Sequence, residues 1–130
     1  MAGKGKILIV DDVKENVILL DAILTAEGFD VSKAYGGKEA LETVKLVMPD
    51  LVLLDVMMPE MDGNEVCAIL RKDSLTASVP VIMVTAKDKD RDIVRSLETG
   101  ADDYIVKPVV KKDLLAKVNK LLSRQKKAGG

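Results

Sequence analysis

Residues 49–63 read PDLVLLDVMMPEMDG, and the run Leu51-Val52-Leu53-Leu54-Asp55 within them decides how the chain folds. Four apolar residues without a polar break favour a strand that is covered on both faces. A carboxylate that closes such a run is costly unless it lies where the strand leaves the core. In an open parallel sheet, ligands bind at these carboxyl ends. Asp55 is therefore either a turn or capping residue, a common role for Asp, or the reacting group of a site.

The rest of the chain repeats this pattern, with short apolar runs alternating with segments of helical periodicity. The predicted strands cover residues 6–10, 29–34, 51–55, 81–85 and 103–107, and a helix is expected after each of them. Glycines at positions 28 and 100 follow the first and fourth helical segments, as is typical of a helix C-terminus. Strict alternation of strand and helix predicts the α/β class. With right-handed crossovers, the natural candidate is a flavodoxin-like, doubly wound, five-stranded parallel sheet in the order 2-1-3-4-5 with five helices.

Length and charge limit the function classes. The 130 residues are expected to form one domain over residues 6–124, between a flexible N-terminus (1–5) and a flexible tail (125–130). The net charge of -1 gives no general attraction to nucleic acid or to an anionic membrane. No apolar run approaches the roughly 18 residues that span a bilayer, and the first residues lack the apolar core of a signal peptide. We therefore expect a cytoplasmic protein.

The sequence contains no histidine and a single cysteine, Cys67. An intramolecular disulfide, a cysteine metal cluster and catalysis by a histidine of this chain are therefore excluded. Any metal must be held by oxygen atoms, which selects a hard cation such as Mg²⁺, with Mn²⁺ as a second candidate. Cys67 lies among apolar residues and is expected to be buried.

Five polar side chains are expected at one edge of the sheet, where four of its strands end. They are Asp11, Asp12, Asp55, Thr85 and Lys107. Two carboxylates a few ångströms apart repel by about 4 kcal/mol at an effective dielectric near 20, so a divalent cation among them is the economical expectation. Beside such a cation, an ionised Asp55 is suited to attack a phosphoryl group, with the Lys107 ammonium and the Thr85 hydroxyl directed at the transferring oxygens.

With these motifs in order, the chain resembles the receiver domain of two-component response regulators from Lys6 to about Arg124. It looks closest to the receivers of stand-alone cell-cycle and diguanylate-cyclase-type regulators. The motifs that carry the resemblance are Val10-Asp11-Asp12, Leu54-Asp55-Val56-Met57-Met58-Pro59, Met61-Asp62-Gly63, Val84-Thr85-Ala86 and Tyr104-Ile105-Val106-Lys107-Pro108.

The resemblance implies a role for each acidic residue of the site. Asp55 would accept a phosphoryl group from a partner histidine kinase or histidine phosphotransfer protein. Asp12, Asp55 and the backbone carbonyl of Met57 would ligate Mg²⁺ directly, whereas Asp11 would act mainly through a water molecule. Because the apolar Met57 side chain cannot orient an attacking water well, we expect a phosphorylated form that lives longer than that of a receiver with a carboxamide at this position.

The resemblance also implies how the site would be read out. Thr85 and Lys107 would contact the phosphoryl oxygens, Lys107-Pro108 would be a cis peptide, and Tyr104 would swing inward as Thr85 moves. The chain would be a phosphorelay signalling domain rather than an enzyme, catalysing only its own phosphorylation and dephosphorylation. Its partners would be the phosphodonor and either a downstream protein or a missing output domain, with no direct nucleic-acid or membrane contact. It would be a monomer or a phosphorylation-linked homodimer, and Asp103 could pair with Lys117 on the surface used for partners.

Other interpretations use the same residues. A haloacid-dehalogenase-type phosphatase needs a second Asp two residues after its nucleophile, where Met57 stands. A flavodoxin-like cofactor binder needs aromatic side chains to enclose a flavin, and this chain has few. Taken singly, the two aspartates at 11 and 12 could cap a helix, Thr85 could cap another, and Lys107 could extend from a buried strand to solvent.

Overall fold

The computed structural model describes residues 4–129, with side chains described up to residue 124. Five strands and five helices alternate along the chain. The strands are β1 (Lys6–Val10), β2 (Asp30–Ala34), β3 (Leu51–Leu54), β4 (Val81–Thr85) and β5 (Asp103–Val106). The helices are α1 (Lys14–Ala26), α2 (Gly37–Val47), α3 (Gly63–Lys72), α4 (Asp90–Glu98) and α5 (Lys111–Gly129).

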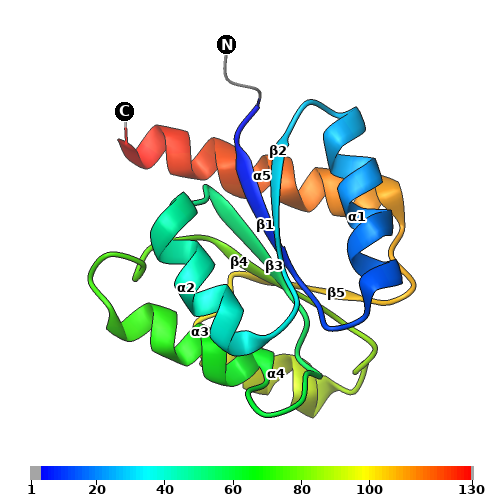
Figure 1. The fold of residues 1–130 in the computed structure, drawn as a ribbon, viewed down its shortest axis with the longest axis vertical. Coiled ribbons are helices and arrows are strands. Elements are labelled where there is room, and N and C mark those ends of the chain that lie inside the picture. The colour runs from blue at the N-terminus through cyan, green and yellow to red at the C-terminus, as the bar shows by residue number, and fades with distance from the viewer. Residues whose placement is uncertain (1–3, 130) are drawn as a thin grey trace.

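All five strands are parallel, and their order is β2-β1-β3-β4-β5 (Figure 1). The predicted flavodoxin-like fold is therefore confirmed. Because the order reverses direction beside β1, the crossover helices divide between the two faces of the sheet. Helices α1 and α5 cover one face, and α2, α3 and α4 cover the other (Figure 1).

Alternate residues of each strand enter one of two apolar layers. On the central strand β3, Leu51 and Leu53 pack toward α1 and α5, whereas Val52 and Leu54 pack toward α2 and α3. All four side chains are no more than 1% exposed. Burial on both faces explains why the strand sequence is continuously apolar and not alternating. The expected burial of Cys67, which lies in the second of these layers, is confirmed.

The structure places the ends of several elements differently from the sequence prediction. Strand β3 ends at Leu54, one residue before its predicted end, so that Asp55 is the first residue beyond the sheet. Strand β5 ends at Val106, one residue before its predicted end. The helical backbone of α5 continues to Gly129. The expected flexibility of residues 1–5 and 125–130 stays a prediction, since residues 1–3 and 130 lie outside the described part of the chain.

Between residues 4 and 129, no helix is both long enough and apolar enough to cross a lipid bilayer.

Candidate functional site

The polar residues predicted from the strand ends lie together at the carboxyl edge of the sheet. Asp11 follows β1 and Asp55 follows β3, and the backbone N–H of Asp55 donates to the carbonyl of Val10 at 2.9 Å. Thr85 is the last residue of β4, and its carbonyl accepts a hydrogen bond from the Lys107 N–H at 2.9 Å. These backbone bonds join the end of β3 to that of β1 and the end of β5 to that of β4, and the parallel pairing of β3 with β4 connects the two pairs. Asp11 and Lys107, which are 96 positions apart in sequence, therefore share one site.

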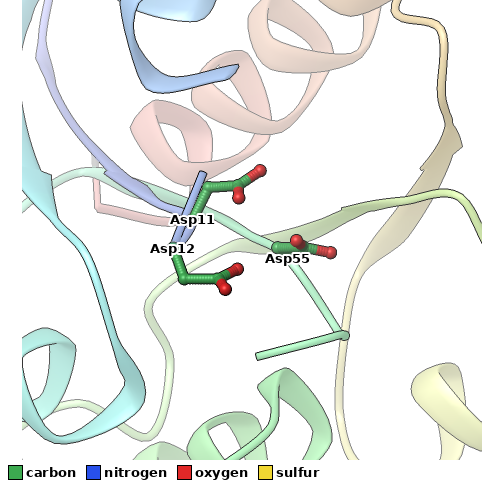
Figure 2. Close-up of side chains that lie close together, drawn as sticks. All are labelled: Asp11, Asp12 and Asp55. Atoms are coloured by element: carbon green, nitrogen blue, oxygen red, sulfur yellow. The ribbon is translucent and has the colours of Figure 1, made fainter. Parts of the chain in front are cut away.

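Three carboxylates form the centre of the site (Figure 2). One oxygen from each of Asp11, Asp12 and Asp55 lies within 4.8 Å of the other two. Asp11 and Asp55 are only 2% and 5% exposed, whereas Asp12 is exposed to solvent. Buried carboxylates at this separation are unfavourable unless a cation lies beside them.

Lys107 provides a cation of the protein itself. Its Nζ lies 2.8 Å from Oδ2 of Asp11 and 3.4 Å from Oδ2 of Asp55. The side chain is about one-fifth exposed and points into the acidic cluster, so its ammonium group does not extend to solvent. Lys107 thus bridges the two buried carboxylates.

Asp11 is held by two further donors. Its Oδ1 accepts the backbone N–H of Val13 at 2.9 Å, and its Oδ2 accepts Nδ2 of Asn16 at 3.1 Å. The N-cap residue of α1 is Val13, and α1 has no side-chain cap hydrogen bond. The alternative in which Asp11 and Asp12 only cap this helix is therefore not supported by the geometry.

Asp55 is less completely neutralised than Asp11. Its Oδ1 accepts the N–H of Met57 at 3.2 Å, and its Oδ2 shares Lys107 with Asp11. Burial raises the pKa of Asp55 above its ordinary value, and the nearby Asp11 carboxylate raises it further; Lys107 and the Met57 N–H offset part of this shift. An ionised Asp55 is therefore an energetically costly group that gains from any additional positive charge.

The donor set suits a hard divalent cation. The three side chains offer only oxygen ligands, close enough for one ion to reach all three. Mg²⁺ is bound in proteins by one or two carboxylates together with water and substrate oxygens, and no histidine or cysteine is needed. The side chains of this cluster therefore fit the ion that the sequence predicts.

Thr85 and Tyr104 are connected through the loop after β4. Thr85 is fully buried, and its Oγ1 accepts the N–H of Lys87 at 3.5 Å. The Tyr104 hydroxyl donates a hydrogen bond to the carbonyl of the same Lys87. Burial, reinforced by Asp92 and then by Asp55, raises the pKa of Tyr104 to about 12. The N-cap residue of α4 is Lys89, and the structure does not use Thr85 as the cap.

The start of α3 packs against the backbone of Asp55, a contact that was not predicted from the sequence. A Cβ on Gly63 would lie 2.3 Å from the backbone oxygen of Asp55, so only glycine allows this approach. Asp62 and Glu65 form a capping box: the Asp62 side chain accepts the N–H of Glu65, and the Glu65 side chain accepts the N–H of Asp62. The Asp-x-x-Glu spacing is visible in the sequence and would have predicted this helix start.

Helix α4 is attached to α3 by a buried polar contact. Ser96 is the buried residue of α4, and its Oγ donates to Oδ1 of Asn64 on α3 at 2.9 Å. A cavity of about 240 Å³ lies beside this contact, between α4 and the loop after β3. It is lined by residues of that loop, of α3 and of α4, and by Tyr104 and Lys87.

Two further expectations concern a peptide bond and a surface ion pair. The Lys107-Pro108 peptide bond is cis. Lys117 Nζ lies 3.5 Å from Oδ1 of Asp103, so these two side chains form an ion pair on the surface of β5 and α5. The Met57 side chain is 56% exposed beside Asp55. The functional roles given to all of these residues stay predictions.

The chain is thus a flavodoxin-like α/β domain with a cluster of carboxylates and a lysine at the carboxyl edge of its parallel sheet. Its family follows from its similarity to known proteins. Residues 7–119 match the model of the response regulator receiver domain. The chain therefore belongs to the receiver domain family of two-component response regulators, and the resemblance found in the sequence is confirmed.

Relatives and solved structures agree with this assignment. The chain is 47% identical over 121 residues to the DNA-binding response regulator MtrA of Mycolicibacterium paratuberculosis, covering 93% of this chain and 52% of that protein. It is 46% identical over 117 residues to the response regulator PleD of Caulobacter vibrioides, covering 90% of this chain and 26% of that protein. The receiver domain of a histidine kinase from Syntrophus aciditrophicus superposes with a TM-score of 0.85 at 42% identity, covering 92% of this chain and 90% of that one.

The match covers only part of the relatives. The chain spans about half the length of MtrA and about a quarter of PleD.

Proposed function

We propose that this receiver domain accepts a phosphoryl group on Asp55, in a Mg²⁺-dependent reaction, from a phosphohistidine of a histidine kinase or histidine phosphotransfer protein. The observation that carries the proposal is the position of Asp55, nearly buried at the end of β3, between the carboxylate of Asp11 and the ammonium of Lys107. Phosphorylation would then switch a protein-interaction surface and pass on a phosphorelay signal.

The transfer is a nucleophilic displacement at phosphorus. An Oδ of ionised Asp55 forms a new O–P bond while the P–N bond to the donor imidazole breaks, and the imidazole keeps the electron pair and takes a proton. The product is an acyl phosphate. The raised pKa of Asp55 stays compatible with an ionised nucleophile where Lys107 and a bound cation compensate its charge.

The surrounding residues would orient and stabilise the transferring group. Lys107 already lies 3.4 Å from the Asp55 carboxylate, so its ammonium is positioned for an oxygen of an attached phosphoryl group. The Thr85 hydroxyl, at the end of the neighbouring strand, would donate a second hydrogen bond.

The metal would be held by the acidic cluster. Asp12, Asp55 and the Met57 carbonyl would ligate Mg²⁺ (or Mn²⁺), with Asp11 acting mainly through water. When bound, the cation would neutralise negative charge on the phosphoryl oxygens. The described side chains support this assignment by their all-oxygen donor set and their mutual spacing.

The readout would run through Tyr104. Its hydrogen bond to the Lys87 carbonyl connects it to the segment that begins at Thr85. Movement of the Thr85 hydroxyl toward a phosphoryl group would break its hydrogen bond with Lys87 or shift this segment. The Tyr104 ring would then be free to move inward. The surface formed by α4, β5 and α5, which carries the Asp103–Lys117 ion pair, would then change its affinity for a downstream protein, an output domain or a second copy of the chain.

The partners follow from the same scheme. MtrA is a DNA-binding response regulator, and the present chain matches only half of it. We propose no direct contact between this domain and nucleic acid, and we propose that it signals through protein contacts, as a monomer or as a phosphorylation-linked homodimer. The net charge of -1 supports this choice because it provides no field that would attract a polyanion.

Intact-mass measurement tests the reaction and its site. The protein is incubated with acetyl phosphate, with Mg²⁺ or with EDTA, beside Asp55→Asn and the control Asp30→Asn, an exposed aspartate at the start of β2. We expect a gain of one phosphoryl group that requires Mg²⁺, persists in Asp30→Asn and is absent from Asp55→Asn. A gain that survives in Asp55→Asn would show that the wrong residue has been named.

A further inference from the structure

Asn16 contacts the acidic cluster although it lies outside the motifs that carry the family resemblance. It is the third residue of α1, and its half-buried side chain turns back toward the carboxyl edge of the sheet. Its Nδ2 donates to Oδ2 of Asp11 at 3.1 Å. Asp11 itself is 2% exposed, so protein groups and not bulk water must satisfy this carboxylate.

The Asp11 carboxylate has three donors of different kinds. The Val13 backbone N–H binds Oδ1, whereas the Asn16 amide and the Lys107 ammonium share Oδ2. Lys107 is divided between Asp11 and Asp55, and under the proposed function it turns to the phosphoryl oxygens. The amide of Asn16 is then the side-chain donor that remains on Oδ2 of Asp11.

Helix formation does not account for this contact. Val13 is the N-cap residue of α1, and the Asn16 side chain makes no cap hydrogen bond. Asparagine inside a helix is a weaker helix former than leucine or alanine. The residue thus costs α1 some stability while its amide holds a carboxylate of the site.

We propose that Asn16 is a positioning residue that fixes the orientation of the Asp11 carboxylate and thereby sets the affinity of the acidic cluster for Mg²⁺. The inference rests on the proposed function, because it assumes that the cluster binds this ion. Partners that orient metal ligands typically change metal affinity by 10–100-fold when they are removed. Asp11 keeps two other donors in the unphosphorylated protein, so we expect an effect at the lower end, about 10-fold.

Mg²⁺ affinity of the unphosphorylated protein gives a readout that does not depend on the reaction. Isothermal titration calorimetry compares wild type with Asn16→Leu, which keeps the approximate side-chain size but removes the amide. The matched control is Asn119→Leu, an exposed position on α5 away from the carboxyl edge. We expect Asn16→Leu to bind Mg²⁺ about 10-fold more weakly. Asn119→Leu should bind as wild type does.

The kinetics with acetyl phosphate should separate an effect on Mg²⁺ binding from an effect on the reaction itself. For Asn16→Leu, the Mg²⁺ concentration at half-maximal rate should rise by the same factor as the dissociation constant. The rate at saturating Mg²⁺ should stay within about twofold of wild type, since a metal held more weakly is still in place at saturation. A general structural defect would instead lower the saturating rate. Asn16→Ala, with the best helix former at this position, replaces the leucine variant if that one does not fold.

The possible outcomes separate a failure of the Asn16 inference from a failure of the proposed function. Unchanged Mg²⁺ affinity in a folded Asn16 variant overturns the inference and leaves phosphorylation of Asp55 intact. A loss of saturating rate at unchanged affinity also overturns it. Wild-type protein that takes up no Mg²⁺ overturns the inference together with the metal-dependent part of the proposed function.

Discussion

Replacing Asp55 by asparagine should stabilise the metal-free protein, although the same change should abolish phosphorylation. The side chain is 5% exposed and lies beside two other carboxylates. Asparagine has nearly the same shape and can still accept the Met57 N–H, but it carries no charge. Lys107 keeps its closer partner, Asp11, at 2.8 Å. The variant therefore removes a costly charge without leaving a buried cation unpaired.

The size of the effect follows from three contributions. At an effective dielectric of about 20, charges 4.8 Å apart repel by about 3.5 kcal/mol, so Asp11 contributes about that much and the solvent-screened Asp12 less. Lys107 at 3.4 Å attracts Asp55 by about 5 kcal/mol, which exceeds the repulsion from Asp11 alone and roughly offsets the repulsion from Asp11 and Asp12 together. The remaining contribution is the desolvation of the carboxylate, which costs several kcal/mol for a fully buried ion. We expect a net stabilisation of about 2 kcal/mol for Asp55→Asn.

Thermal unfolding in EDTA at pH 7 measures this difference. For a domain of this length, 2 kcal/mol corresponds to about 7 °C in Tm. Mg²⁺ should reverse the order: at 100 times its dissociation constant a ligand stabilises by about 2.7 kcal/mol, and the variant, which has lost the charge of one carboxylate ligand, should bind the ion much more weakly. The control is Asp30→Asn, for which both Tm and the response to Mg²⁺ should match those of wild type.

The stability advantage of Asp55→Asn over wild type should increase as the pH rises. Because burial and Asp11 raise the pKa of Asp55 in the folded protein, the folded state binds this proton more tightly than the unfolded state, whose value lies near 3.8. Stability of wild type is therefore lost as the pH rises from about 4 through the raised pKa. The Tm difference should be small near pH 4 and should widen toward neutral pH. An Asp55→Asn protein less stable than wild type in EDTA at pH 7, or a difference independent of pH, would refute the reasoning.

Three further predictions concern residues around the site. Gly63→Ala should lower the free energy of unfolding by about 1–3 kcal/mol in denaturant titrations, because its Cβ would overlap the Asp55 backbone oxygen. Gly36→Ala, at a position with open space around it, should cost less than about 1 kcal/mol, and equal effects would contradict the packing argument. Ser96→Ala should cost about 1–2 kcal/mol by leaving the buried Asn64 amide oxygen without its donor, whereas the exposed Ser123→Ala should be neutral; thermal unfolding of both variants checks this. Met57→Asn should shorten the lifetime of the acyl phosphate, followed by intact mass after the donor is removed, because a carboxamide beside Asp55 can orient water; an unchanged decay rate would count against this role.

Much of the architecture was readable from the sequence for a simple physical reason. Strands buried on both faces need continuous apolar runs, and helices between them need apolar residues at helical spacing, so strand number and fold class follow from periodicity. The carboxyl ends of parallel strands meet at one edge, which brings Asp11, Asp55, Thr85 and Lys107 together without any knowledge of side-chain packing. The candidate site was therefore predictable as a set of residues.

The connections within that set required the tertiary structure. Three hydrogen bonds were not visible in the pattern: that of Asn16 to Asp11, that of Tyr104 to the Lys87 carbonyl, and that of Ser96 to Asn64. Each depends on how a helix or loop docks on the sheet, and a shift of one residue in that docking would send the side chain elsewhere. Periodicity determines which face of an element is buried, but it does not encode the angle and height at which two elements meet. The sequence by itself thus determined the fold and the set of candidate site residues, whereas only the packed structure decided which neighbours hold them in place.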